Sequence, residues 1–239
     1  MGARSVAHRS RKLWIALLIL VAIGLRIYDA AQPDHVPGST DSPPTQGESP
    51  KSRNASNPAS TAEKIGGYES YRGCTLVDAR SNDGDSFMAR LPGGKRALIR
   101  LYFVDAPESA FRSYPGGDTN HERIRQQAAE MGGITPEQAV EIGKQARQFT
   151  LGLLGGRPFD IYTRWDSPFR DNRYHAHVEI REGGRSRWLD ELLIERGLAR
   201  IKTKPAALPD GTPASAHLAR LKDLEHAAKR AEVGVWGLK

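Results

Sequence analysis

The order of strand-like and helix-like segments between residues 71 and 231 restricts this chain to a small set of folds. Residues 71–80, 86–91 and 96–104 are predicted to form strands, and Pro92-Gly93-Gly94 predicts a tight turn between the second and the third. Apolar residues occupy both faces of the third strand. We therefore expect it to be a central strand, covered on both sides.

A helix is predicted to begin at Thr135-Pro136-Glu137-Gln138, where Thr caps the helix, Pro takes the first helical position and Gln completes a capping box. Apolar residues then recur every three or four positions until Gly155-Gly156 ends the helix. Further along the chain we predict strands at 159–165 and 173–180, a short helix that stops at Gly197, and a last helix carrying Leu218 to Ala231. This order indicates an α+β, mainly β fold: a five-stranded barrel with three packed helices, for which the OB-fold is the best-known solution.

Two N-terminal segments lie outside this pattern. In residues 1–31, four basic residues between positions 4 and 12 precede a 13-residue apolar run from Leu13 to Leu25, as in an export signal. The run is shorter than the 20 or so residues that span a membrane, which favours a signal peptide. The alternative interpretation, an uncleaved N-terminal hydrophobic helix that anchors the chain in the membrane, stays open. Residues 32–64 are rich in Pro, Ser, Thr and Asn and are predicted to be a disordered linker. We expect the domain at 65–239 to lie outside the cytoplasm, either secreted or anchored to the membrane.

Composition adds little about partners. The full chain carries a net charge of +7, but residues 65–239 hold 27 basic and 23 acidic residues, which argues only weakly for nucleic acid. The single cysteine, Cys74, excludes an intramolecular disulfide and a multi-thiolate metal site. We expect a monomer.

Two aspartates flank the predicted pair of adjacent strands. Asp85 opens one strand and Asp105 closes the next, and the turn between them makes the strands antiparallel, so both carboxylates come to the same end of the sheet. Asp83-Gly84 alone would be an ordinary turn. Clustered oxygen ligands, however, suit Ca²⁺, and a cation would relieve the repulsion between the two carboxylates. The combination indicates a cation site.

Three further side chains complete a set that can attack a phosphodiester. Arg100 lies five residues before Asp105 in the same strand, Glu108 follows three residues after it, and Arg173 lies on a later strand. A bound metal would polarise the phosphoryl group, Glu108 would take a proton from water, and the guanidinium groups would hold the oxyanion charge.

These residues belong to motifs that resemble the staphylococcal nuclease (thermonuclease) family over about residues 68–238. The motifs are Asp83-Gly84-Asp85-Ser86, Ile99-Arg100-Leu101 through Val104-Asp105-Ala106-Pro107-Glu108, and Leu192 to Gly197-Leu198-Ala199. The resemblance implies an OB-fold and Ca²⁺-dependent endonucleolytic cleavage of DNA and RNA. It implies that Asp85, Asp105 and the main-chain carbonyl of Ala106 bind Ca²⁺, and that Arg100, Glu108 and Arg173 are catalytic.

The chain departs from the family pattern at several positions. Ser86 and Ala106 stand where the family has threonine, and Arg173 lacks the usual Tyr-Gly before it, so it is aligned through the residues that follow. Lys202-Thr203-Lys204 replaces tyrosines that stack on the nucleotide. We therefore expect Lys202 and Lys204 to bind substrate, and the preference between DNA and RNA stays open.

The long connection from 109 to 134 contains Arg112, Tyr114, His121, Arg123 and Arg125. It has two interpretations: a partly helical lid that contacts phosphates near the site, or an insertion without a role. The function also has an alternative. A catalytically weak OB-fold module that binds nucleic acid or protein, tethered to the membrane, could share the same barrel.

Overall fold

The computed structural model describes residues 62–169 and 171–238, so the expected leader and nearly all of the expected linker lie outside the described residues. The strands are β1 (Glu63–Ile65), β2 (Tyr68–Leu76), β3 (Ser86–Arg90), β4 (Arg96–Leu101), β5 (Val104–Asp105), β6 (Phe159–Thr163), β7 (Tyr174–Glu182), β8 (Arg185–Trp188) and β9 (Arg200–Ile201). The helices are α2 (His121–Glu130), α3 (Pro136–Gly155), α4 (Leu189–Glu195) and α5 (Ala214–Arg230), followed by the 3₁₀ turn η1 (Gly234–Gly237). In this part of the chain no helix is long and apolar enough to cross a bilayer.

Five of the strands close into a mixed β-barrel. The order is β2, β3, β4, β7 and β6, and β6 pairs back onto β2. The pairing of β4 with β7 is parallel, and the other pairs around the barrel are antiparallel. Phe87, Ile99, Ile161 and Val178 point from four of these strands into a fully buried core. The result is an α+β fold with a closed barrel, which is compatible with the expected OB-fold.

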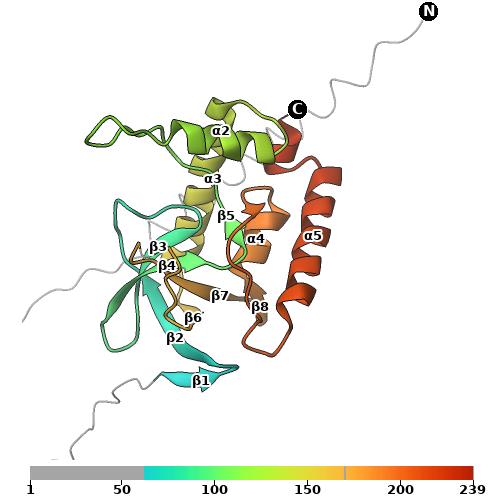
Figure 1. Cartoon of the computed structure of the whole chain (residues 1–239). Helices are drawn as coiled ribbons and strands as arrows, with labels where there is room; N and C mark the ends of the chain where they lie inside the picture. The colour runs from blue at the N-terminus through green and yellow to red at the C-terminus, as the bar shows by residue number, and fades with distance from the viewer. Residues whose placement is uncertain (1–61, 170, 239) are drawn as a thin grey trace, which may run out of the picture. The chain divides into compact units, whose positions relative to one another are not determined.

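The prediction of three packed helices is wrong for the described residues, which contain four. The helix predicted to begin at Thr135 is present as α3, with the capping box intact: Gln138 N donates to Thr135 Oγ1 at 3.2 Å, and Thr135 N donates to Gln138 Oε1 at 2.9 Å. The predicted helices α4 and α5 pack against each other beside the barrel (Figure 1). The additional helix is α2, which lies in the 109–134 connection and packs on α3 (Figure 1).

The predicted strand at 96–104 is interrupted. Its first part, β4, lies between β3 and β7 and is central, as expected. Phe103 then adopts a left-handed backbone conformation with φ of 65°, and the chain leaves the barrel sheet. After this bend Val104 pairs with Ile201 of β9. The bend redirects the segment that carries Asp105 and Glu108, so the backbone conformation at Phe103 helps to position the candidate site.

Candidate active site

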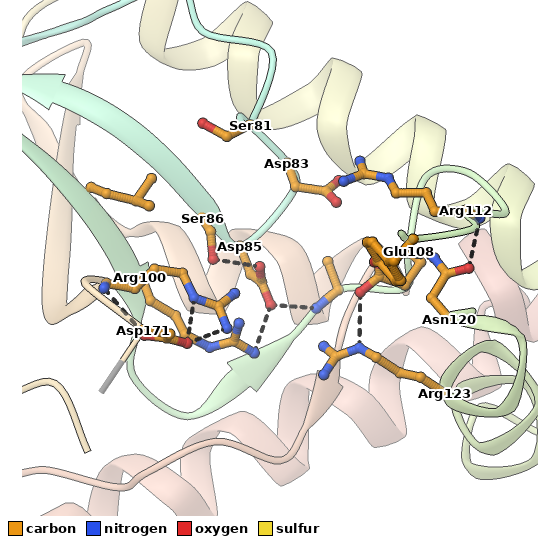
Figure 2. A pocket seen from close by; sticks show the side chains of 14 residues that line it. Ser81, Asp83, Asp85, Ser86, Arg100, Glu108, Arg112, Asn120, Arg123 and Asp171 are labelled. Carbon is orange, nitrogen blue, oxygen red and sulfur yellow. Dashed lines mark hydrogen bonds and ion pairs between the residues drawn. The ribbon is translucent and has the colours of Figure 1, made fainter. Parts of the chain in front are cut away.

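A pocket at one end of the barrel collects most of the side chains that the sequence singled out (Figure 2). Its lining residues come from the turn before β3, from β4, from the connection that contains α2, and from the segment before β7. They are Ser81, Asp83, Asp85, Ser86, Leu98, Arg100, Ala106, Glu108, Arg112, Tyr114, Asn120, Arg123, Asp171 and Arg173. The three expected catalytic residues are all in this set, and so are two of the three expected metal ligands.

Arg100 brings the two aspartates together. It lies opposite Ser86 in the antiparallel register of β3 and β4, directly beside Asp85. Its Nη2 atom is 2.7 Å from Asp105 Oδ1 and 3.4 Å from Asp85 Oδ2. All three side chains are buried, with Arg100 only 4% exposed. Both carboxylates therefore contact one guanidinium group at the same end of the sheet.

Glu108 lies at the more open side of this cluster, where its carboxylate is 19% exposed. One oxygen, Oε1, is 2.9 Å from Arg123 Nε, and the other accepts a 3.3 Å hydrogen bond from Asn120 Nδ2. The same Arg123 side chain reaches Asp105 Oδ1 at 2.8 Å through Nη2. Arg123 thus bridges the expected general base and an expected metal ligand, and Figure 2 shows its side chain extending to Glu108.

The second expected catalytic arginine, Arg173, lies just before β7 and lines the same pocket. Asp171 holds its guanidinium group through Nε at 2.8 Å and Nη2 at 2.5 Å. The two expected substrate-binding lysines lie elsewhere. Lys202 pairs with Glu130 at 3.0 Å and Lys204 pairs with Asp166 at 2.6 Å, and neither lines the pocket.

One face of α2 and its N-cap supplies site residues, of which the sequence analysis named only Arg123, under the lid interpretation of the 109–134 connection. Asn120, Arg123, Gln127 and Glu130 recur at helical spacing and therefore share a face. Gln127 Nε2 donates to Asp105 Oδ2 at 3.0 Å and to the carbonyl of Ala106 at 3.1 Å. Gln127 Oε1 accepts a hydrogen bond from the backbone N of Glu108 at 3.0 Å. Such a polar stripe is visible in the sequence, but only once a helix is assigned there.

Arg200 of β9 closes the far side of the cluster. Its Nη2 atom is 2.8 Å from Asp105 Oδ2, and its Nη1 atom is 2.8 Å from Glu130 Oε2. β9 is paired with β5, and Arg200 lies directly opposite Asp105 in that register. The contact therefore follows from the bend at Phe103, a tertiary feature that the strand prediction did not include.

The carboxylates of the pocket differ in their electrostatic environment. Burial, reinforced by the neighbouring Asp85, raises the pKa of Asp83 to about 6. Burial likewise raises the pKa of Asp85, although Arg100 opposes the shift. Asp105 is equally buried, yet Arg123 and the other donors around it outweigh burial and hold its pKa below the usual value. The Asp83 and Asp85 side of the pocket thus has less compensating positive charge than Asp105, since Arg100 is the one guanidinium group that lowers the pKa of Asp85.

Two of the three expected ligands keep the oxygen lone pairs that a hard divalent cation needs, whereas Asp105 accepts from four donors. Asp85 accepts from Ser86 Oγ at 3.0 Å and from the backbone N of Ala106 at 3.1 Å. Within the described part of the chain the Ala106 carbonyl accepts from Gln127 alone, so both groups keep oxygen lone pairs. Among the described residues, no group of three or more His, Cys, Asp or Glu side chains is arranged to hold a metal. The expected set has only two carboxylates and a carbonyl, so water would have to supply the remaining ligands.

No family model and no curated protein matches this chain. The class of protein is therefore defined by its structure: an α+β protein whose closed, mixed five-stranded barrel has a pocket of acidic and basic side chains at one end.

Proposed function

We propose that this protein is an extracytoplasmic, Ca²⁺-dependent nuclease that hydrolyses phosphodiester bonds in DNA, RNA or both. The proposal includes an OB-fold of the staphylococcal nuclease type. One observation carries it: Asp85, Arg100, Glu108 and Arg173 line a single pocket, and Asp105 is bonded to that same Arg100. These residues are up to 88 positions apart in the chain. Nothing in a merely structural barrel requires them to meet.

Each side chain has a role that its chemistry allows. Glu108, the most exposed of the three acidic residues, accepts a proton from the attacking water. Arg100 and Arg173 hold the charge that develops on the phosphoryl oxygens, for which a forked guanidinium is suited. Asp85, Asp105 and the Ala106 carbonyl would hold the cation. When bound, Ca²⁺ would supply Lewis-acid polarisation of the phosphoryl group.

The rim of the pocket suits a polymeric, charged substrate with exposed bases. Tyr114 lines the pocket and is 45% exposed, and Arg112 beside it is also exposed. Tyr114 sits on a short hairpin closed by a 2.7 Å hydrogen bond from its own N to the Asp118 carbonyl. An exposed ring next to guanidinium groups is a combination that binds single-stranded nucleic acid through base stacking and phosphate contacts.

The test is a digestion assay on the purified protein with single-stranded DNA, duplex DNA and RNA as parallel substrates. We expect cleavage with added CaCl₂ and none in EGTA. Equal cleavage in both buffers would reject the cation requirement. Absence of cleavage under every condition, with the protein folded by circular dichroism, would reject the hydrolase.

The second candidate is a non-catalytic module that binds nucleic acid or protein. One observation favours it: Asp105 already accepts hydrogen bonds from three arginines and Gln127, so the cluster is satisfied without a cation. This candidate predicts binding of single-stranded DNA that EGTA does not change, together with the absence of products in the digestion assay.

A further inference from the structure

Arg123 contacts both Asp105, an expected metal ligand, and Glu108, and these contacts have a consequence for metal binding. The inference below rests on the proposed Ca²⁺-dependent function.

Asp105 has no free acceptor position in this structure. An ionised carboxylate offers about four lone-pair sites. Oδ1 accepts from Arg100 at 2.7 Å and from Arg123 at 2.8 Å, and Oδ2 accepts from Arg200 Nε and Gln127 Nε2, both at 3.0 Å. A divalent cation can coordinate Asp105 only if one of these four donors leaves.

Arg123 is the donor that can leave most easily. Its side chain is 43% exposed, whereas the side chains of Arg100 and Arg200 are 4% and 10% exposed. Gln127 is fully buried and also bonds the backbone of Glu108. An exposed guanidinium can exchange a carboxylate for water at little cost, while a buried one would be left unpaired.

Arg123 also contributes charge to the same place. Its guanidinium group contacts both Asp105 and Glu108, so it neutralises two of the three acidic side chains that the proposed mechanism uses. The charges of Asp105 and Glu108 in turn raise the pKa of Arg123 against the effect of burial. A cation entering the cluster therefore has to compete with a positive charge that belongs to the protein.

We propose that Arg123 sets the Ca²⁺ affinity of this site: it holds Asp105 and Glu108 when no cation is bound and releases Asp105 when one binds. The helix α2 is accordingly part of the cation site rather than an insertion without a role. Arg123 is a positioning residue here, because it acts through the two carboxylates.

The experiment measures Ca²⁺ binding by isothermal titration calorimetry on the full-length wild-type protein, on R123Q and on R125Q. Arg125 is a matched control, because it lies on the same helix, is 59% exposed and pairs only with Glu122 among the contacts of the described residues. We expect R123Q to bind Ca²⁺ about tenfold more tightly than wild type, because the substitution removes one ion pair that competes with the cation for Asp105. R125Q should stay within about twofold of wild type.

A third variant, R123K, keeps the charge and tests the bridging geometry. Lysine has a single ammonium group and cannot bond two carboxylates through a planar fork. The Ca²⁺ affinity of R123K should therefore fall between those of wild type and R123Q. Equal or weaker Ca²⁺ binding by R123Q would overturn the inference, and so would equal tightening in R125Q, which would indicate a general charge effect. If none of the proteins binds Ca²⁺, the cation site of the proposed function fails as well.

Discussion

Glu108 is the most solvent-accessible of the three acidic residues expected to act, with its side chain 19% exposed against 7% for Asp85 and 3% for Asp105. A general base must reach water, whereas a metal ligand can be buried once its charge is compensated. The burial of these three carboxylates therefore agrees with the division of roles that the spacing suggested. Arg100, nearly inaccessible, is held in place by both aspartates.

Replacement of Glu108 by glutamine tests the general base. Gln keeps the size of the side chain but cannot accept the proton, so we expect kcat with Ca²⁺ to fall by about 10²–10⁴-fold. Circular dichroism should be unchanged. Glu122→Gln is the control, since Glu122 is an exposed partner of Arg125 on α2, and it should retain activity. Wild-type turnover in E108Q would remove Glu108 from the mechanism.

Tyr114 provides a second test at the pocket rim. Base–aromatic stacking is worth about 1–3 kcal/mol, so Tyr114→Ala should raise KM for single-stranded DNA about tenfold or more while kcat changes little. Tyr114→Phe keeps the ring and should behave like wild type. Steady-state kinetics of the two variants separate the ring from the hydroxyl; an unchanged KM in Y114A would exclude stacking at this position.

The helix α3 packs very closely against the two loops that hold the acidic residues of the site. A Cβ atom on Gly143 would lie 2.4 Å from the carbonyl oxygen of Glu108 and 2.6 Å from that of Pro107. One turn further along α3, Ala146 packs equally closely against Gly84: a Cβ atom on Gly84 would lie 2.7 Å from the Cβ of Ala146. Both acidic loops thus rest on small residues of one helix. This packing was not predictable from the helix pattern alone, which identified only apolar positions that recur every three or four residues.

Substitution of Gly143 by alanine should therefore displace the loop that carries Glu108. We expect a loss of about 1–3 kcal/mol in the free energy of unfolding, as for overpacked sites, together with reduced activity. Gly152→Ala on the same helix is the matched control. Nothing lies within 4 Å of a Cβ there, so alanine should stabilise the helix by about 0.5–1 kcal/mol. Urea denaturation of both variants and of wild type measures the free energies of unfolding. If G143A were as stable as wild type, the loop that carries Glu108 would be able to move without a loss of stability.

The whole described domain buries polar groups beside its apolar core. His177 of β7 is 2% exposed and lies against Tyr68 and Tyr102, and its Nε2 atom is 3.1 Å from the Ala207 carbonyl. Burial lowers the pKa of His177 from 6.5 to about 4, although the charge of Asp190 opposes this shift. The histidine therefore stays neutral in the folded protein at pH values where it would be protonated in the unfolded chain.

This difference predicts that stability falls with acidification. Between pH 6.5 and 4 the unfolded chain binds a proton at His177 that the folded protein does not, so the contribution of His177 to the free energy of unfolding decreases as the pH falls through this range. The raised pKa of Asp83 contributes with the opposite sign, so the effect of His177 is read from the difference between wild type and H177Q. The depressed pKa corresponds to about 3 kcal/mol in total. His177→Gln should show a flatter dependence between pH 7 and 4.5 in urea denaturation. The same slope in wild type and H177Q would assign the effect to other groups.

The local features of this protein were predictable from the amino-acid sequence: the capped helix at Thr135, the turn at Pro92 to Gly94, the central strand, and the aspartate, glutamate and arginine residues that gather at one end of the sheet. These depend on side-chain periodicity and on backbone preferences over a few residues, which are readable without a structure. The bend at Phe103, the pairing of β5 with β9, and the contacts of α2 with Asp105 and Glu108 became visible in the folded structure alone. Those features depend on long-range packing, which brings three guanidinium groups from distant segments to one carboxylate, and no local pattern encodes that convergence.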